Sequence, residues 1–146
     1  MSDQDVESRI ASLLRQVPEM GDRVFRCSAL EGGITNRNYL IESDGVRWVL
    51  RLSGDNTALL GISREHESDA LIKASRAGLA PRIIFSDVKA GVLISEFVAG
   101  EVLTPAMVRE SDRLDRVVNA VRMIHAGPVI AARFDAFAIV QDYHRL

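Results

Sequence analysis

Only Ser43-Asp44-Gly45 separates two strand-like runs, and this short link constrains the fold more than any other feature of the sequence. The runs over 38–42 and 46–52 are rich in β-branched and aromatic residues, as strands are. An Asp-Gly pair between such runs is a strong hairpin signal. A parallel crossover needs about a dozen residues or more, so this link cannot carry one. The sequence therefore predicts adjacent antiparallel strands.

The same pattern extends along the chain. Further strand-like runs are expected at 24–30, 82–86 and 92–97. Between them lies a helical segment over 64–77, with Ser63 placed to cap its start and Gly78 placed to end it. The order of these elements favours an α+β fold, with about five antiparallel strands and one central helix against one face of the sheet.

Helices are also expected at both ends of the chain. Apolar residues recur at helical spacing over 3–17, and again between Leu114 and Ile124, after a short helix begun by Thr104-Pro105. A last helical segment begins at Phe134. We therefore expect an N-terminal helix over 1–22, a lobe over 23–98, and a connector with opening helices of a further lobe over 99–146.

Composition excludes several classes of function. The chain has 18 basic and 20 acidic residues, a net charge of −2, and so lacks the basic excess of a nucleic-acid binder. No apolar run approaches the roughly 20 residues of a membrane helix, and the acidic N-terminus is no signal peptide. The single cysteine, Cys27, suits a reducing compartment. We expect a cytoplasmic protein with neither a nucleic acid nor a membrane as partner.

Metal and triad chemistry find no support. The histidines are His66, His125 and His144. No two of them stand at ligand spacing on one helix, so we predict no zinc site and no Ser-His-Asp arrangement.

A glycine loop, Gly32-Gly33-Ile34-Thr35-Asn36, lies between the first two expected strands. Two glycines remove side chains, so that backbone N–H groups can approach phosphate oxygens closely. The alternative is a glycine hairpin loop without chemical consequence. The loop matches neither the GxGxxG fingerprint nor the P-loop pattern.

Arg51 is the second candidate. Strand alternation places it beside Val49 on one face, with Trp48, Leu50 and Leu52 on the other. It is either a solvated arginine or a cation facing a ligand. Glu65, in the first turn of the central helix, is either a carboxylate favoured by the helix dipole or an ion-pair partner for Arg51.

The run 94–98 is followed by Ala99-Gly100 and then by helices, as expected of a connector between two lobes. Its exposed backbone groups could meet a planar base. An ordinary edge strand is the alternative.

In this order, these features resemble the amino-terminal lobe of the choline/ethanolamine kinase and aminoglycoside phosphotransferase superfamily, which has a kinase-like fold. The residues that carry the resemblance are Leu30 to Tyr39, Val49-Leu50-Arg51-Leu52, Arg64-Glu65, Gly78-Leu79-Ala80-Pro81 and Ile94 to Gly100. The Leu-Arg-Leu strand is more similar to the choline kinases than to the antibiotic kinases.

The resemblance implies ATP as cofactor, bound through Gly32, Gly33, Thr35, Asn36, Arg51, Glu65, Ser95 and Phe97. The glycine loop would cover the phosphates, and Arg51, held by Glu65, would contact the α- and β-phosphates. The backbone of Ser95 and Phe97 would meet the adenine.

The family's catalytic Asp, its Asn and a metal-binding Asp lie in a carboxy-terminal lobe, and the sequence ends at Leu146 before any such motif. The resemblance thus implies Mg²⁺ held outside these residues, and no catalytic or metal residue within them. The expected activity is an ATP-dependent kinase of a small amino alcohol such as choline or ethanolamine, with the 146-residue chain inactive alone. A stand-alone, non-catalytic nucleotide- or partner-binding lobe is the alternative.

The last 30 or so residues are unusually apolar for a terminus, which is normally polar and frayed. We therefore expect this segment either to meet a missing carboxy-terminal lobe or to self-associate.

Overall fold

The computed structural model describes residues 3–31, 36–54 and 63–130, and scattered residues beyond 130. The chain packs into two units: Met1–Asp55 with Pro81–Ala99, and Asn56–Ala80 with Gly100–Leu146. The central helix thus groups with the carboxy-terminal helices. The three-part division expected from the sequence stays a prediction.

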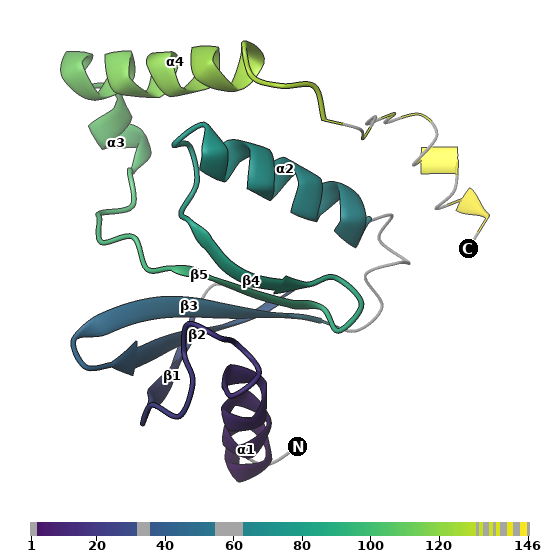
Figure 1. Cartoon of the computed structure of the whole chain (residues 1–146). Coiled ribbons are helices and arrows are strands. Elements are labelled where there is room, and N and C mark those ends of the chain that lie inside the picture. Colours follow the sequence, from purple (N-terminus) through teal and green to yellow (C-terminus); the bar gives the residue numbers. More distant parts are fainter. Residues whose placement is uncertain are drawn as a thin grey trace. The chain divides into compact units, whose positions relative to one another are not determined.

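A five-stranded sheet forms the first unit (Figure 1). Its strands are β1 (Arg26–Leu30), β2 (Asn36–Ser43), β3 (Val46–Ser53), β4 (Ile83–Asp87) and β5 (Val92–Glu96). They are ordered β1-β2-β3-β5-β4, and every neighbouring pair is antiparallel. The predicted α+β fold with an antiparallel sheet is confirmed.

The turn between β2 and β3 follows from its two residues. Asp44 has φ 49° and Gly45 has φ 78°, the left-handed pair of a type I′ turn. This turn matches the twist of the strands and pairs Ser43 with Val46. The register of the whole hairpin is set there.

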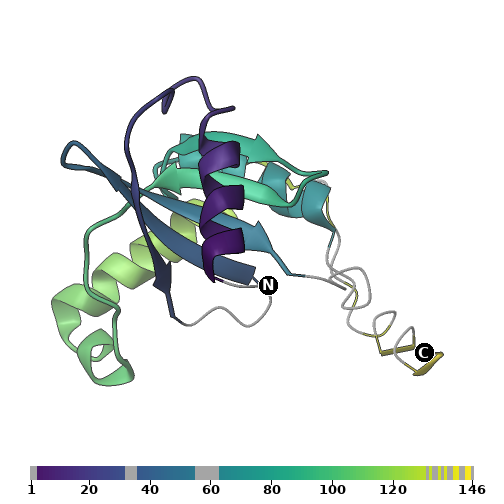
Figure 2. The ribbon, with the colours of Figure 1, turned by 90° about the horizontal axis from the view of Figure 1, so that it is seen from below.

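One face of the sheet is covered by α1 (Asp3–Leu14), which lies across the strands in Figure 2. Ile10 and Leu14 of this helix are buried in one cluster with residues of β2, β3 and β5. The buried sheet residues of that cluster are Ile41, Trp48, Leu50, Leu52, Val92 and Ile94, and the partly buried Cys27, Tyr39, Ile84 and Phe85 pack against it. The helix is shorter than expected, because residues 15–20 tighten into turns that bury Val17 and Met20.

The second unit contains α2 (Arg64–Arg76), α3 (Pro105–Val108) and α4 (Ser111–His125). The predicted caps are present: Ser63 Oγ accepts the His66 N–H, and Thr104 Oγ1 accepts the Met107 N–H. Lys73 of α2 donates to Asp69 at 2.7 Å and to the Val129 carbonyl at 2.8 Å. It thereby ties α2 to the segment that follows α4.

Helices long and apolar enough to cross a bilayer are absent from the part of the chain that the structure describes. Beyond 130, Phe137 and Val140 are helical, and most of the helix expected from Phe134 lies outside the described residues.

Candidate nucleotide-binding face

The sheet has a second face, opposite α1, and Arg51 lies on it. Trp48, Leu50 and Leu52 are buried under α1, so alternation turns the half-buried Arg51 the other way. Arg51 pairs in register with Asn38 of β2 and Leu93 of β5. The sequence-based placement of Arg51 is therefore confirmed, and the strand holds this cation in the middle of the sheet.

Two other predicted site residues share this face with Arg51. Asn36 begins β2 opposite Ser53, and Ser95 of β5 lies opposite Val49. Register places all three on the same side of the sheet. Of the glycine loop, Gly32, Gly33 and Thr35 lie outside the described residues.

Phe97, directly after β5, is already bonded to the sheet. Its N–H donates to the Arg47 carbonyl at 3.1 Å, which continues the β3–β5 register by one pair. Hydrogen-bonded pairs alternate along antiparallel strands, so Ser95 exchanges its bonds with Val49. The backbone groups of Ser95 and Phe97 that face β3 are therefore committed to the ladder.

The next donor along the chain is the Val98 N–H. Alternation points it away from β3, and within the described ranges the N–H has no hydrogen-bond partner. Val98 is 65% exposed. A planar ligand could meet this donor beside the end of β5.

Arg47 also holds Phe97 by its side chain. The guanidinium carbon lies 4.3 Å from the centroid of the Phe97 ring, a cation–π contact. The first residue after β5 is thus fixed to β3 by backbone and side chain together.

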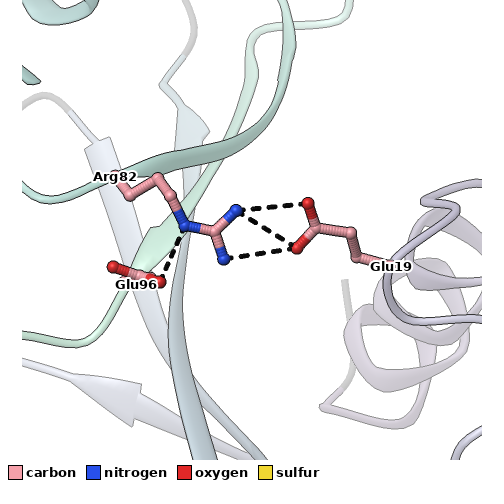
Figure 3. Close-up of polar contacts among 3 residues, drawn as sticks. All are labelled: Glu19, Arg82 and Glu96. Atoms are coloured by element: carbon pink, nitrogen blue, oxygen red, sulfur yellow. Dashed lines mark hydrogen bonds and ion pairs between the residues drawn. The ribbon is translucent and has the colours of Figure 1, made fainter. Parts of the chain in front are cut away.

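Arg82 fixes the other side of β5, as Figure 3 shows. Its Nε donates to Glu96 at 2.8 Å, and its terminal nitrogens reach Glu19 from 3.2 Å. The Glu96 N–H donates in turn to the Arg82 carbonyl. The hydrogen bonds to Glu96 and then Glu19 raise the pKa of Arg82, so the guanidinium stays charged throughout the working pH range.

Glu65 belongs to the second unit, where it is exposed in the first turn of α2. Its neighbour Glu67 accepts a 2.6 Å bond from Arg64 and therefore has a local structural role. The pairing of Glu65 with Arg51 stays a prediction.

Groups of three or more His, Cys, Asp or Glu residues that could hold a metal ion are absent from the residues that the structure describes. The half-buried Cys27 is no candidate nucleophile, because burial and then the charge of Glu7 raise the pKa of its thiol.

Sequence reasoning missed Arg47, Arg82 and Val98. Arg82 bonds to Glu19, 63 positions away in the sequence, and no local pattern reports such a contact. The role of Val98 depends on which β3–β5 pairs are hydrogen-bonded. The sequence signal nearest to it was the connector, for which the resemblance implied the backbone of Ser95 and Phe97 as the contact.

The chain matches the phosphotransferase enzyme family over residues 26–145. Protein LicA of Haemophilus influenzae is 34% identical over 117 residues, which cover 79% of this chain and 34% of LicA. The LicA of strain KW20 is 32% identical over 115 residues, 77% of this chain and 43% of that protein. The chain thus matches less than half the length of each of these relatives.

Among solved structures, a choline/ethanolamine kinase family protein from Mesorhizobium loti matches with a TM-score of 0.72 and 26% identity, covering 95% of this chain and 45% of that one. A LicA structure in complex with AMP matches with a TM-score of 0.72 at 22% identity, covering 99% and 49%. The choline kinase LicA of Streptococcus pneumoniae gives 0.68 at 21%, covering 97% and 47%.

Proposed function

Because the chain belongs to the phosphotransferase enzyme family, we propose that it is the nucleotide-binding lobe of an ATP-dependent kinase acting on the hydroxyl of a small amino alcohol such as choline or ethanolamine. One observation carries the proposal. The sheet presents Arg51 on the face opposite α1, with Asn36 from the end of the glycine loop on the same side.

Arg51 supplies the charge for the nucleotide. Phosphoryl transfer depends mostly on positioning and on neutralising charge, with little covalent chemistry for the protein to do. The backbone of Arg51 is held by strand pairing on both sides, and its guanidinium can form charge-assisted bonds to phosphate oxygens. The peptide groups of the loop from Gly32 to Asn36 would cover those phosphates.

We assign the adenine contact to the Val98 N–H in place of the Phe97 N–H, because the latter already donates to Arg47. Arg47 and Arg82 hold the end of β5 from two sides, so this donor is fixed before a ligand arrives. Fixing it in advance lowers the entropic cost of binding.

When bound, Mg²⁺ would neutralise charge on the phosphates. No cluster of its ligands occurs in the described part of the chain, so we place its ligands and the catalytic Asp in the remainder of the family fold. The names of the solved relatives, choline and ethanolamine kinases among them, support the acceptor class.

The experiment gives the complete phosphotransferase ATP and Mg²⁺ with choline, ethanolamine or an aminoglycoside, and measures the phosphorylated product. We expect product from choline or ethanolamine and none from the aminoglycoside. Product from the aminoglycoside alone would overturn the acceptor class.

A non-catalytic, nucleotide-binding lobe is the second candidate function. This second candidate predicts that the protein binds nucleotide but forms no phosphorylated product from any acceptor. The 146-residue chain tested in parallel should form no product under either candidate.

A further inference from the structure

A pocket of about 500 Å³ lies within the second unit, between the connector and α4. Gly100, Glu101 and Leu103 line it from the connector, and Arg113, Arg116 and Val117 line it from the helix. Its volume falls in the range of about 300–1,000 Å³ that is usual for small-molecule sites. None of these residues has a part in the proposed nucleotide site.

Arg113 has an unmet hydrogen-bonding need at this pocket. Its Nε donates to Glu110 at 3.1 Å, whereas its Nη1 is buried without a hydrogen-bond partner among the described residues. A buried donor without an acceptor is unfavourable. The side chain as a whole is 34% exposed, and Arg113 is one of the residues that line the pocket.

Arg116 stands one helical turn further along the same face, and its side chain is exposed. Against these two cations the lining contains one carboxylate, Glu101, so the lining carries a net positive charge. Glu110, outside the lining, is engaged by Arg113 Nε. The remaining wall is apolar, formed by Leu103, Val117 and Ala120.

We propose that this pocket binds a small ligand with an oxyanion head, a carboxylate or a phosphate, held by Arg113 and Arg116 and with its apolar part against Leu103 and Val117. A guanidinium presents paired donors that match the oxygens of either group. The bound head satisfies the Arg113 amino group that the fold leaves without an acceptor.

Hydrogen exchange followed by mass spectrometry on the 146-residue chain tests the site. Exchange is compared in sodium chloride, inorganic phosphate and butyrate at equal ionic strength. A ligand at about three times its Kd should slow exchange about fourfold in peptides covering 100–120. Slowing by phosphate alone identifies a phosphate head group, and slowing by butyrate alone identifies a carboxylate. Slowing by both identifies a general oxyanion site.

The variants separate the site from a salt effect. Arg113→Gln should abolish the slowing of exchange. Arg113→Lys keeps the positive charge but loses the paired donors of the guanidinium, so it should weaken the slowing. Arg122→Gln, on α4 but outside the pocket, should retain it in full. No slowing by either anion, or slowing that survives in Arg113→Gln, would overturn the proposal.

Discussion

Arg47 and Phe97 contact each other twice, once through the backbone and once through their side chains. The Phe97 N–H donates to the Arg47 carbonyl at 3.1 Å, and the Arg47 guanidinium carbon lies 4.3 Å from the centroid of the Phe97 ring. The pair joins the start of β3 to the residue that follows β5. The position of the proposed adenine contact at Val98 therefore depends on a contact outside the proposed phosphate-binding residues.

Replacing Arg47 with Ala should remove the cation–π contact and leave the backbone bond. The expected loss of unfolding free energy is about 0.5–1 kcal/mol, typical of an exposed pair. Trp48, the only tryptophan and a buried core residue, reports this unfolding by fluorescence in urea. Arg26→Ala, another exposed strand arginine, is the matched control and should unfold as wild type does. Equal losses in both variants would show that the ring contact contributes nothing.

Arg82→Lys should lower the midpoint of thermal unfolding, because an ammonium cannot reach Glu96 and Glu19 in the same forked geometry. The contacts of Arg82 with Glu96 and Glu19 are exposed. The difference in unfolding midpoint from wild type should therefore shrink at about 1 M salt, where the Debye length is about 3 Å. Calorimetry at low and high salt measures both effects. A salt-independent difference would point to packing rather than charge.

Gly91 allows a close approach that no other residue could make. It has φ +65°, and a Cβ there would lie 2.8 Å from the Ser53 Cβ. The Ser53 N–H also donates to the Gly91 carbonyl at 2.8 Å. We expect Gly91→Ala to cost about 1–3 kcal/mol, from backbone strain and the clash together. Gly45→Ala has a positive φ but open space, so the Trp48 signal should show a smaller loss for it.

These examples show how far the sequence could predict the fold. The Asp44-Gly45 turn and the Ser63 cap depend on neighbouring residues, so local patterns were enough to predict them. Alternation likewise placed Arg51 on the correct face. By contrast, the Arg82 cluster depends on which distant segments meet, which one sequence does not encode locally.

The candidate site also combines a feature that neighbouring residues predict with one that depends on distant strand pairing. Arg51 could be chosen from its strand alone, but the state of each backbone N–H near Phe97 depends on the phase of hydrogen bonding between β3 and β5. That phase follows from strand pairing across more than 40 residues. The sequence therefore predicted the connector, whereas the hydrogen bond of the Phe97 N–H to Arg47 became visible only in the structure.

Cys27 should react slowly with alkylating reagents in the folded chain. Burial and the Glu7 charge raise the pKa of its thiol above the ordinary value of 9.0, which lowers the fraction of reactive thiolate. Because the folded pKa is raised, its stabilising effect is complete below pH 9 and is lost as the pH rises through the folded pKa. The rate of iodoacetamide labelling of Cys27 at pH 8, with and without urea, measures this protection. Equal labelling rates in the folded and unfolded chain would contradict the prediction.

The exposed apolar face of α4 should make the 146-residue chain self-associate. Leu114, Val118, Val121 and Ile124 are all at least 36% exposed along this helix. At about 25 cal/mol per Å², burying about 400 Å² of apolar surface would contribute about 10 kcal/mol. Light scattering should detect assemblies that Val121→Glu reduces. Val46→Glu, at an exposed apolar position on the β2–β3 turn, should not reduce them, and a monodisperse wild-type monomer would refute the prediction.

Steady-state kinetics of Arg51→Ala in the complete phosphotransferase test the central claim most directly. Loss of a charge-assisted bond to phosphate should raise the KM for ATP about tenfold or more and leave the KM for choline nearly unchanged. Arg37→Ala, on β2 but on the other face of the sheet, should change neither constant. A selective loss in ATP use is the result that our account predicts. Equal losses for ATP and choline would contradict the assignment of this lobe to the nucleotide.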